Sequence, residues 1–210
     1  MPAAPELTAQ DAEALERCAA AGGLAVVPTD TIYGLACDPD DQDAVTRLQA
    51  LKGRDAAKPS AVLFSRPELA IAATPWLDEA TSDALARLLP GPVTVIVANP
   101  QHRFPLACGD RPERLGIRVP RWPEPAQALS ELSWPLLQSS ANRSGGEDIA
   151  TIEQLDHTLC DAADLILDAG PLPGTASTVV DLSGYAADGS WRVLRRGAVD
   201  ERWLARRLDL

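Results

Sequence analysis

Short apolar runs alternate with helix-like patterns along this chain, and this alternation is the feature that most limits its fold. The run VTVIVA at residues 93–98 is rich in β-branched side chains and predicts a strand. Thr8–Ala21 predicts a helix, because Thr8 suits the N-cap and the pair Gly22-Gly23 ends the pattern. The other predicted strands cover residues 24–28, 60–65, 115–119, 135–140, 165–167, 177–183 and 191–195, and the other predicted helices cover residues 41–51, 77–89, 151–159 and 200–208.

This mixture predicts an α/β fold in which helices flank a twisted, open, mixed sheet. The last two predicted strands are joined by a short turn, so part of the sheet should be antiparallel. The 210 residues contain no internal repeat and no clear linker, which favours a single domain over residues 1–210.

The composition excludes several classes of protein. A net charge of −11 argues against a general nucleic-acid binder, since phosphate neutralisation dominates the affinity of such proteins. The four cysteines, at positions 18, 37, 108 and 160, lack metal-ligand spacing and are interpreted as reduced thiols. The first residues resemble no signal peptide, and no stretch reaches the roughly 18 apolar residues of a membrane span. We therefore expect a soluble, cytoplasmic protein without membrane contact.

Polar residues follow the predicted strand at 24–28. The sequence PTDT places Thr29, Asp30 and Thr31 where a simple connection would more often use a short Gly, Asn or Pro turn. This arrangement is typical of a strand end that presents hydroxyl groups to a small polar ligand. For Thr29 and Asp30 individually, a capped turn remains an alternative.

Three cations lie close together in LKGRDAAKPS, at Lys52, Arg54 and Lys58. Gly53 lets the chain leave the preceding helix, so that Lys52 and Arg54 can converge on one anion such as a phosphate or carboxylate. A basic helix C-terminus that complements the helix dipole explains the same residues equally well.

Two further groups of polar residues follow or interrupt predicted strands. The segment QSSANRSGG contains Ser140 and Asn142, which can bond phosphate or ribose oxygens, although an ordinary polar turn is an alternative. Arg118 and Arg195 lie within apolar strand patterns, and Ser177 opens another strand. Ligands of α/β sheets usually lie beyond the carboxyl ends of strands. Cations, hydroxyls and amides without an evident nucleophile favour phosphoryl or nucleotidyl transfer.

Seven blocks, taken in order, resemble the YrdC-like family of L-threonylcarbamoyl-AMP synthases, in its short single-domain bacterial type. The blocks are PTDTIYGLACDP, LKGRDAAKP, PGPVTVIV, LGIRVPR, SSANRSG, STVVDL and LRRG, and the resemblance as a whole covers about residues 12–199. The resemblance implies a twisted open sheet around a deep concave groove. It also implies a nucleotidyltransferase that condenses L-threonine, bicarbonate or CO2 and ATP to threonylcarbamoyl-AMP and pyrophosphate. The product would pass to a tRNA threonylcarbamoyltransferase complex for modification of adenosine 37.

The resemblance also implies roles for individual residues. Lys52 and Arg54 would be catalytic, by neutralising charge that develops on the phosphates. Threonine would be bound by Thr31, Arg118 and Ser177, and ATP by Arg54, Lys58, Gln138, Ser140, Asn142 and Arg195, with Gln138 acting chiefly through its backbone. Mg²⁺ would be held mainly by the ATP phosphates, and no protein ligand for a metal is assigned. Leu63 departs from relatives that carry a histidine at this position as a threonine contact.

Three other functions remain to be weighed. A paralogue of the same fold with weak or different activity would tend to lack the Lys-x-Arg pair, which this chain keeps. An RNA-binding or ribosome-assembly factor would need a locally basic groove. The net charge of the whole chain does not exclude such a groove, so weak RNA binding is kept as an alternative. The carbamoyl-transfer modules of hydrogenase maturation lie in much longer chains with zinc-type cysteine motifs, which are absent here.

Overall fold

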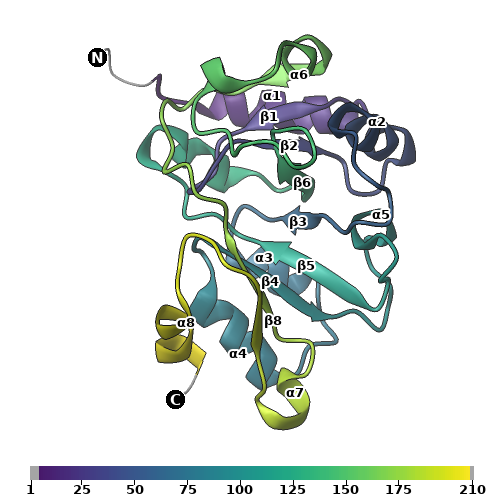
Figure 1. The fold of residues 1–210 in the computed structure, drawn as a ribbon, viewed down its shortest axis with the longest axis vertical. Coiled ribbons are helices and arrows are strands. Elements are labelled where there is room, and N and C mark those ends of the chain that lie inside the picture. Colours follow the sequence, from purple (N-terminus) through teal and green to yellow (C-terminus); the bar gives the residue numbers. More distant parts are fainter. Residues whose placement is uncertain (1–4, 209–210) are drawn as a thin grey trace.

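The computed structural model describes residues 5–208, in which nine strands form one mixed sheet (Figure 1). Across the sheet the strand order is β7-β1-β2-β6-β3-β5-β4-β8-β9. The strands are β1 (Ala25–Val27), β2 (Gly34–Cys37), β3 (Ala61–Leu63), β4 (Val93–Ala98), β5 (Arg114–Arg118), β6 (Leu136–Ser140), β7 (Leu165–Ile166), β8 (Thr178–Asp181) and β9 (Arg192–Arg195). The pairs β1/β7, β3/β5 and β4/β8 are parallel, and the other neighbours are antiparallel.

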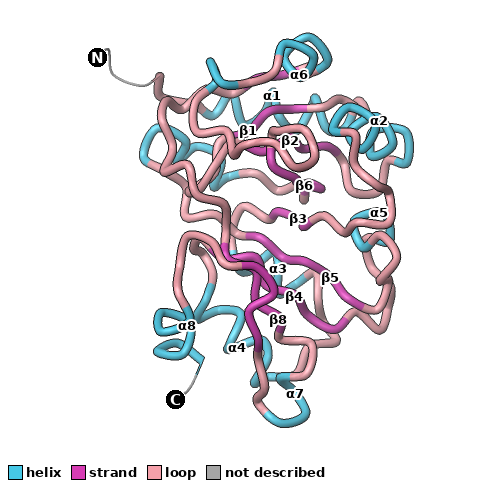
Figure 2. The backbone as a smooth tube through the Cα atoms, viewed as in Figure 1, coloured by secondary structure: helices cyan, strands magenta, loops and turns pink. Residues whose placement is uncertain are grey.

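Eight α-helices and two 3-10 helices connect these strands in the described part of the chain (Figure 2). They are α1 (Ala9–Ala20), α2 (Gln42–Lys52), α3 (Pro67–Ala72), α4 (Glu79–Leu88), α5 (Pro105–Cys108), η1 (Glu124–Glu131), η2 (Ile152–Gln154), α6 (His157–Ala162), α7 (Tyr185–Asp188) and α8 (Glu201–Leu208). None of the described helices is long and apolar enough to cross a membrane.

Side chains alternate between the two faces of the sheet, and each face has its own apolar cluster. Val62, Val95 and Ile117 point to one face, where α2, α4 and α8 contribute to a large core. Leu63 points to the other face and packs in a second cluster with residues of α1 and η1. This second cluster covers only the part of the face near β1, β2 and β6. Over β3, β5 and β4, the same face carries Ala61, Gly116, Ile96 and other residues that line a cavity.

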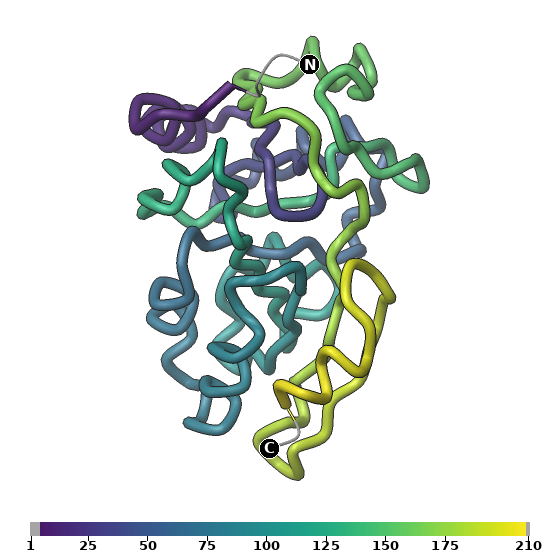
Figure 3. Tube along the Cα trace, turned by 90° about the vertical axis from the view of Figure 1, so that its left-hand side faces the viewer, coloured from purple at the N-terminus to yellow at the C-terminus, as the bar shows by residue number. Residues whose placement is uncertain are grey.

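The segment of residues 167–177 runs from β7, at one edge of the sheet, to β8 near the other edge (Figure 3). It crosses the turn after β1, where Gly174 N donates to Thr31 O at 2.9 Å. The Tyr33 hydroxyl donates to Gly170 O at 2.7 Å and accepts from Ala169 N at 3.0 Å. These contacts hold the crossing segment against the turn.

The predicted α/β class with a twisted mixed sheet is confirmed, and several elements differ from the prediction. The run at 93–98 forms β4 with the predicted bounds. The predicted helix at 151–159 is wrong as one element, because Leu155 is extended and separates η2 from α6. Strand β2 and helices α3, α5, η1 and α7 were not predicted. The single-domain bounds of 1–210 stay a prediction, because residues 1–4 and 209–210 lie outside the described residues. Residues 1–4 also begin the segment that was compared with a signal peptide, so that part of the prediction lies outside the described residues as well.

Candidate active site

A cavity of about 230 Å³ lies on the half-covered face of the sheet. Its walls combine strand residues with the turn after β1 and the end of the crossing segment. The cavity is lined by Thr29, Thr31, Ile32, Arg54, Pro59, Ser60, Ala61, Thr94, Ile96, Gly116, Arg118, Gln138, Ser139, Ser140, Ala176, Ser177, Val179, Leu194 and Arg195. Three arginines and seven hydroxyl-bearing residues therefore face one small volume in an acidic protein.

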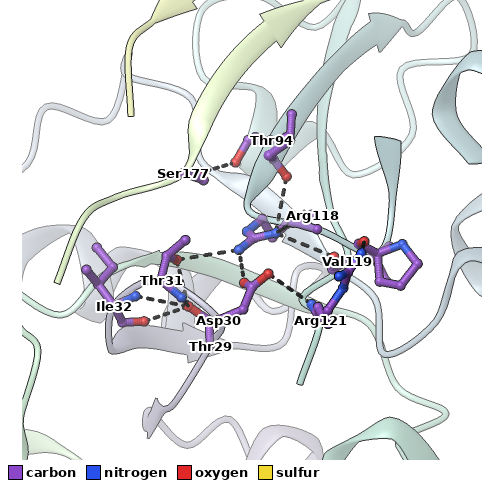
Figure 4. Close-up of polar contacts among 12 residues, drawn as sticks. Thr29, Asp30, Thr31, Ile32, Thr94, Arg118, Val119, Arg121 and Ser177 are labelled. Atoms are coloured by element: carbon purple, nitrogen blue, oxygen red, sulfur yellow. Dashed lines mark hydrogen bonds and ion pairs between the residues drawn. The ribbon is translucent and has the colours of Figure 1, made fainter. Parts of the chain in front are cut away.

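The turn after β1 is fixed by its own hydroxyl groups (Figure 4). Thr29 Oγ1 donates to Ile32 O at 2.7 Å and accepts from Ile32 N at 3.3 Å. Thr29 Oγ1 also lies 2.9 Å from Thr31 Oγ1, and both threonines are buried. Both threonines line the cavity, and the bonds of Thr29 to Ile32 are those of a capped turn, which was the alternative for this residue.

Arg118 crosses the floor of the cavity and is only 2% exposed. Its Nη1 donates to the carbonyls of Gly91 and of Val93, the latter at 3.2 Å. Its Nη2 donates to the Asp30 carboxylate and lies 3.4 Å from Thr31 Oγ1. Burial lowers the pKa of the guanidinium, and the Asp30 charge acts in the opposite direction. Asp30 therefore compensates a buried positive charge and fixes its orientation.

Asp30 also joins the turn after β1 to the chain beyond β5. Its Oδ2 accepts from Arg121 N at 3.0 Å, while Oδ1 holds Arg118. The sequence analysis singled out Asp30 only as part of a polar turn. The sequence does show an unpaired carboxylate at Asp30 and a charged residue within a strand pattern at Arg118. Their pairing could not be inferred from this, because the two positions lie 88 residues apart.

Ser177 is held by two neighbours on the opposite side of Arg118 (Figure 4). Thr94 Oγ1 and Ser177 Oγ are 2.8 Å apart, so one hydroxyl donates to the other. Arg195 Nη2 donates to Ser177 O at 2.8 Å and to Ser177 Oγ at 3.2 Å. Burial lowers the pKa of Arg195, and Asp148 opposes that shift. Thr94 was missed in the sequence, where it is one polar residue in an apolar strand.

Lys52 lies behind the cavity wall and is not among the residues that line it. Its Nζ donates to Ser140 O and to Asn142 O, the latter at 2.6 Å. Burial, and secondarily the nearby Arg54 charge, lower the pKa of Lys52 to about 8, while Asp148 opposes the shift. The sequence analysis predicted that Lys52 and Arg54 can converge on one anion. In the structure, Arg54 lines the cavity and the lysine is tied to the backbone of the Ser140–Asn142 segment, so the convergence stays a prediction.

Arg54 does line the cavity and carries an unusual unsatisfied group. Its Nη2 donates to Pro59 O at 2.7 Å. Its Nε is the one buried side-chain nitrogen or oxygen in residues 5–208 that has no hydrogen-bond partner. Burial, together with the Arg195 charge, lowers the pKa of Arg54. A buried donor without a partner costs about 1–3 kcal/mol, and an anionic ligand would remove that cost.

Of the remaining predicted site residues, some line the cavity and others lie outside it. Gln138 and Ser140 line it, as does Ser139, which the sequence analysis did not assign. Asn142 lies outside it and accepts from Ser140 Oγ at 2.5 Å, so it contacts a lining residue. Lys58 is exposed and does not line the cavity. The structure thus brings seven of the ten predicted residues to one cavity: Thr31, Arg54, Gln138, Arg118, Ser140, Ser177 and Arg195.

The donor set of the site fits phosphate better than a bare metal ion. Arginine side chains and hydroxyls can donate to phosphate oxygens, and the Arg54 Nε donor has no protein acceptor. Within residues 5–208, no three His, Cys, Asp or Glu side chains lie close enough together to hold a metal ion.

Comparisons with known proteins point in one direction. The profile of the Sua5/YciO/YrdC family, described as "Telomere recombination", matches residues 17–197. The chain is 35% identical over 166 residues to a threonylcarbamoyl-AMP synthase of Chromohalobacter salexigens, a match that covers 77% of this chain and 86% of the relative. It is 33% identical over 163 residues to a threonylcarbamoyl-AMP synthase of Pseudomonas aeruginosa, covering 78% of this chain and 86% of that relative.

Two solved structures are similar over nearly the whole chain. The structure of P. abyssi Sua5 complexed with L-threonine superposes with a TM-score of 0.80 and 25% identity, covering 96% of this chain and 58% of that chain. The chain therefore spans a little over half the length of Sua5. E. coli YciO superposes with a TM-score of 0.79 and 25% identity, covering 93% of this chain and 94% of that chain.

Proposed function

This chain belongs to the Sua5/YciO/YrdC family, and from that membership we propose that it is an L-threonylcarbamoyl-AMP synthase. The observation that carries the proposal is the grouping of Arg54, Arg118 and Arg195 around one hydroxyl-lined cavity in a chain of net charge −11. The substrates are L-threonine, bicarbonate or CO2, and ATP, and the products are threonylcarbamoyl-AMP and pyrophosphate.

The amino acid binds at the floor of the cavity in this proposal. Arg118 and the hydroxyls of Thr31 and Ser177 lie on facing sides of one small space, as a carboxylate with an adjacent polar group requires (Figure 4). Asp30 and Thr94 hold Arg118 and Ser177 in place. The binding energy is then not spent on ordering these side chains, which is the advantage of a preorganised site.

The nucleotide phosphates bind at the Arg54 end of the cavity. Arg54 offers its unpartnered Nε, and Arg195 and Ser140 face the same space. Lys52 lies behind this wall, where its charge acts on the phosphates while its hydrogen bonds fix Ser140 and Asn142. Mg²⁺ is held mainly by phosphate oxygens, as this ion often is. Lys58, which does not line the cavity, adds positive charge on the segment that follows Arg54, and Gln138 contributes chiefly through its backbone.

The reaction proceeds in two steps. The threonine amine attacks CO2 and loses a proton to solvent, which gives a carbamate. A carbamate oxygen then attacks the α-phosphorus of ATP, and pyrophosphate leaves with the electron pair of the broken P–O bond. The fixed cations at Arg54, Arg195 and Lys52 stabilise the charge on the phosphates in the transition state, without reorganising as charge shifts.

The product would be passed, in the cytoplasm, to a protein complex that modifies tRNA. Direct RNA binding would need a local basic surface and should weaken steeply with salt if it occurs. The Lys52 and Arg54 pair, retained here, favours the synthase over a paralogue without this activity.

Pyrophosphate release from ATP and Mg²⁺ tests the proposal directly. Threonine and bicarbonate are omitted in turn, and serine replaces threonine in a parallel reaction. Release that needs both threonine and bicarbonate is the expected result. Release that persists without either, or that never occurs, would exclude the synthase activity.

A further inference from the structure

The segment that carries Arg54 depends on other parts of the chain for its shape. Helix α2 ends at Lys52, Gly53 adopts a left-handed φ of 57°, and residues 54–60 form neither helix nor strand. Arg54 Nη2 donates to Pro59 O, so the guanidinium follows the course of this segment. Any element that fixes residues 57–60 therefore also fixes Arg54.

That element is the short helix α5 with the turn that follows it. Ser60 N donates to Ala107 O at 2.8 Å, and Asp110 N donates to Ala57 O at 3.1 Å. The two bonds hold the segment at two points three residues apart. Figure 1 shows α5 on the same side of the sheet as α2, beside the start of β5.

Gly109 makes the close approach between these segments. Its φ is 59°, in the left-handed region, and a Cβ added there would lie 2.3 Å from Ala57 O and 2.8 Å from Ala57 C. Both contacts are with backbone, which cannot swing aside as a side chain can. A residue larger than glycine must therefore displace residues 57–59 or the turn itself.

The turn is rigid enough to act as a support. Asn99 is fully buried, and its Nδ2 donates to Arg103 O and to Pro112 O, both at 2.9 Å. Its Oδ1 accepts from Arg103 N at 3.0 Å. One side chain thus ties both ends of the loop that contains α5 and Gly109.

We propose that Gly109 is a positioning residue for the nucleotide, because its contact with Ala57 sets the place of Arg54 through Pro59. This inference rests on the proposed function only in taking the ligand of Arg54 to be an ATP phosphate. Gly109 itself does not line the cavity. Its effect should be confined to ATP, since the turn after β1, Arg118 and Ser177 are held by other contacts.

The test compares Gly109→Ala with Gly189→Ala. Gly189 also has a positive φ, 71° with a ψ of 9°, and an added Cβ would meet no heavy atom within 4 Å, so the control adds a Cβ at positive φ without the contact. Binding of Mg²⁺-ATP and of L-threonine is measured separately by calorimetry on the whole chain. Gly109→Ala should weaken ATP binding about tenfold or more, since displacements near 1 Å can cost as much as 10²-fold in a catalytic site. Threonine binding should change less than about twofold, and Gly189→Ala should leave both ligands unaffected.

A second variant separates strain from contact. Gly109 has φ 59° and ψ −128°, values of the first central position of a type II′ turn, where Asn also occurs, so Gly109→Asn lowers the strain relative to Ala but keeps a Cβ against Ala57. A selective loss of ATP binding in either folded Gly109 variant supports the proposal. Unchanged ATP binding, an equal loss of both ligands, an equal effect in Gly189→Ala, or failure of both Gly109 variants to fold while the control folds would each overturn it. If the unsubstituted protein binds ATP but releases no pyrophosphate, the proposed function fails and the positioning role is still decided by binding.

Discussion

The ion pair between Asp30 and Arg118 should contribute strongly to both stability and threonine binding. Arg118 is 2% exposed, and Asp30 is its one carboxylate partner within residues 5–208. Removing one member of a buried pair typically costs about 3–5 kcal/mol, because the other charge is left uncompensated. Asp30→Asn keeps one acceptor oxygen, which can serve Arg118 or Arg121 N but not both, and we expect a loss of about 3 kcal/mol. For a chain of this length that corresponds to a fall in Tm of about 6–12 °C.

The assay is thermal and urea unfolding with and without saturating L-threonine. The threonine carboxylate should partly replace the lost charge beside Arg118, so threonine should raise the Tm of Asp30→Asn by more than it raises that of the unsubstituted protein. Asp40→Asn is the matched control, because Asp40 pairs with Arg103 at 3.2 Å while both side chains are about half exposed. Such an exposed pair contributes at most about 1 kcal/mol. Equal losses in the two variants, or a threonine effect that is the same with and without Asp30, would refute the reasoning.

Three further outcomes are expected. The pKa of Lys52, lowered to about 8, predicts that pyrophosphate release falls as pH rises through 8. The free energy of unfolding should rise between about pH 8 and the ordinary lysine pKa of 10.5, because the unfolded chain then holds a proton that the native state has lost. Lys52→Met should abolish this rise and lower turnover about 10²-fold. Near-normal turnover in this variant would contradict the catalytic role of Lys52. Tyr33→Phe leaves Ala169 N without its 3.0 Å acceptor and should cost about 1–3 kcal/mol in urea unfolding, whereas a loss near zero would show that the crossing segment is held elsewhere. Thr94→Val removes the 2.8 Å contact to Ser177 and should raise the KM for threonine about fivefold, the equivalent of about 1 kcal/mol, with the KM for ATP as the internal control.

The sequence predicts most of the regular structure where local signals are strong. β4 has the predicted bounds because five of its six residues are β-branched, and α2 ends at Lys52, directly before the predicted exit at Gly53. β2 escaped prediction because its four residues follow a polar turn and contain no periodic pattern. Its strand conformation comes from pairing with β1 and with β6, about 100 residues further along the chain. Pairing over such a distance leaves no trace in a local window of sequence.

The site shows the same division between local and long-range information. Thr31, Arg118 and Ser177 were noted as polar residues beside or within predicted strands and were grouped by the family resemblance, and the structure brings them to one cavity. The direction of Lys52 was not predictable, because it depends on carbonyl groups of residues 140 and 142, which only the fold places nearby. Lys58 was noted as one of three neighbouring cations and assigned to ATP by the resemblance, and in the structure its side chain is exposed.

The location of the cavity follows from which part of the sheet the chain leaves uncovered. α1 and η1 cover one half of a face, and over the other half that face carries small side chains together with buried polar ones. Buried polar groups are costly unless they are hydrogen-bonded, and here Arg118, Thr29 and Ser177 have their partners within the protein. Arg54 Nε is the exception, and it lies on the segment that Gly109 supports from outside the cavity. The fold thus satisfies the groups that shape the amino-acid end and leaves one cationic donor free at the other end, where a phosphate oxygen gains most by binding.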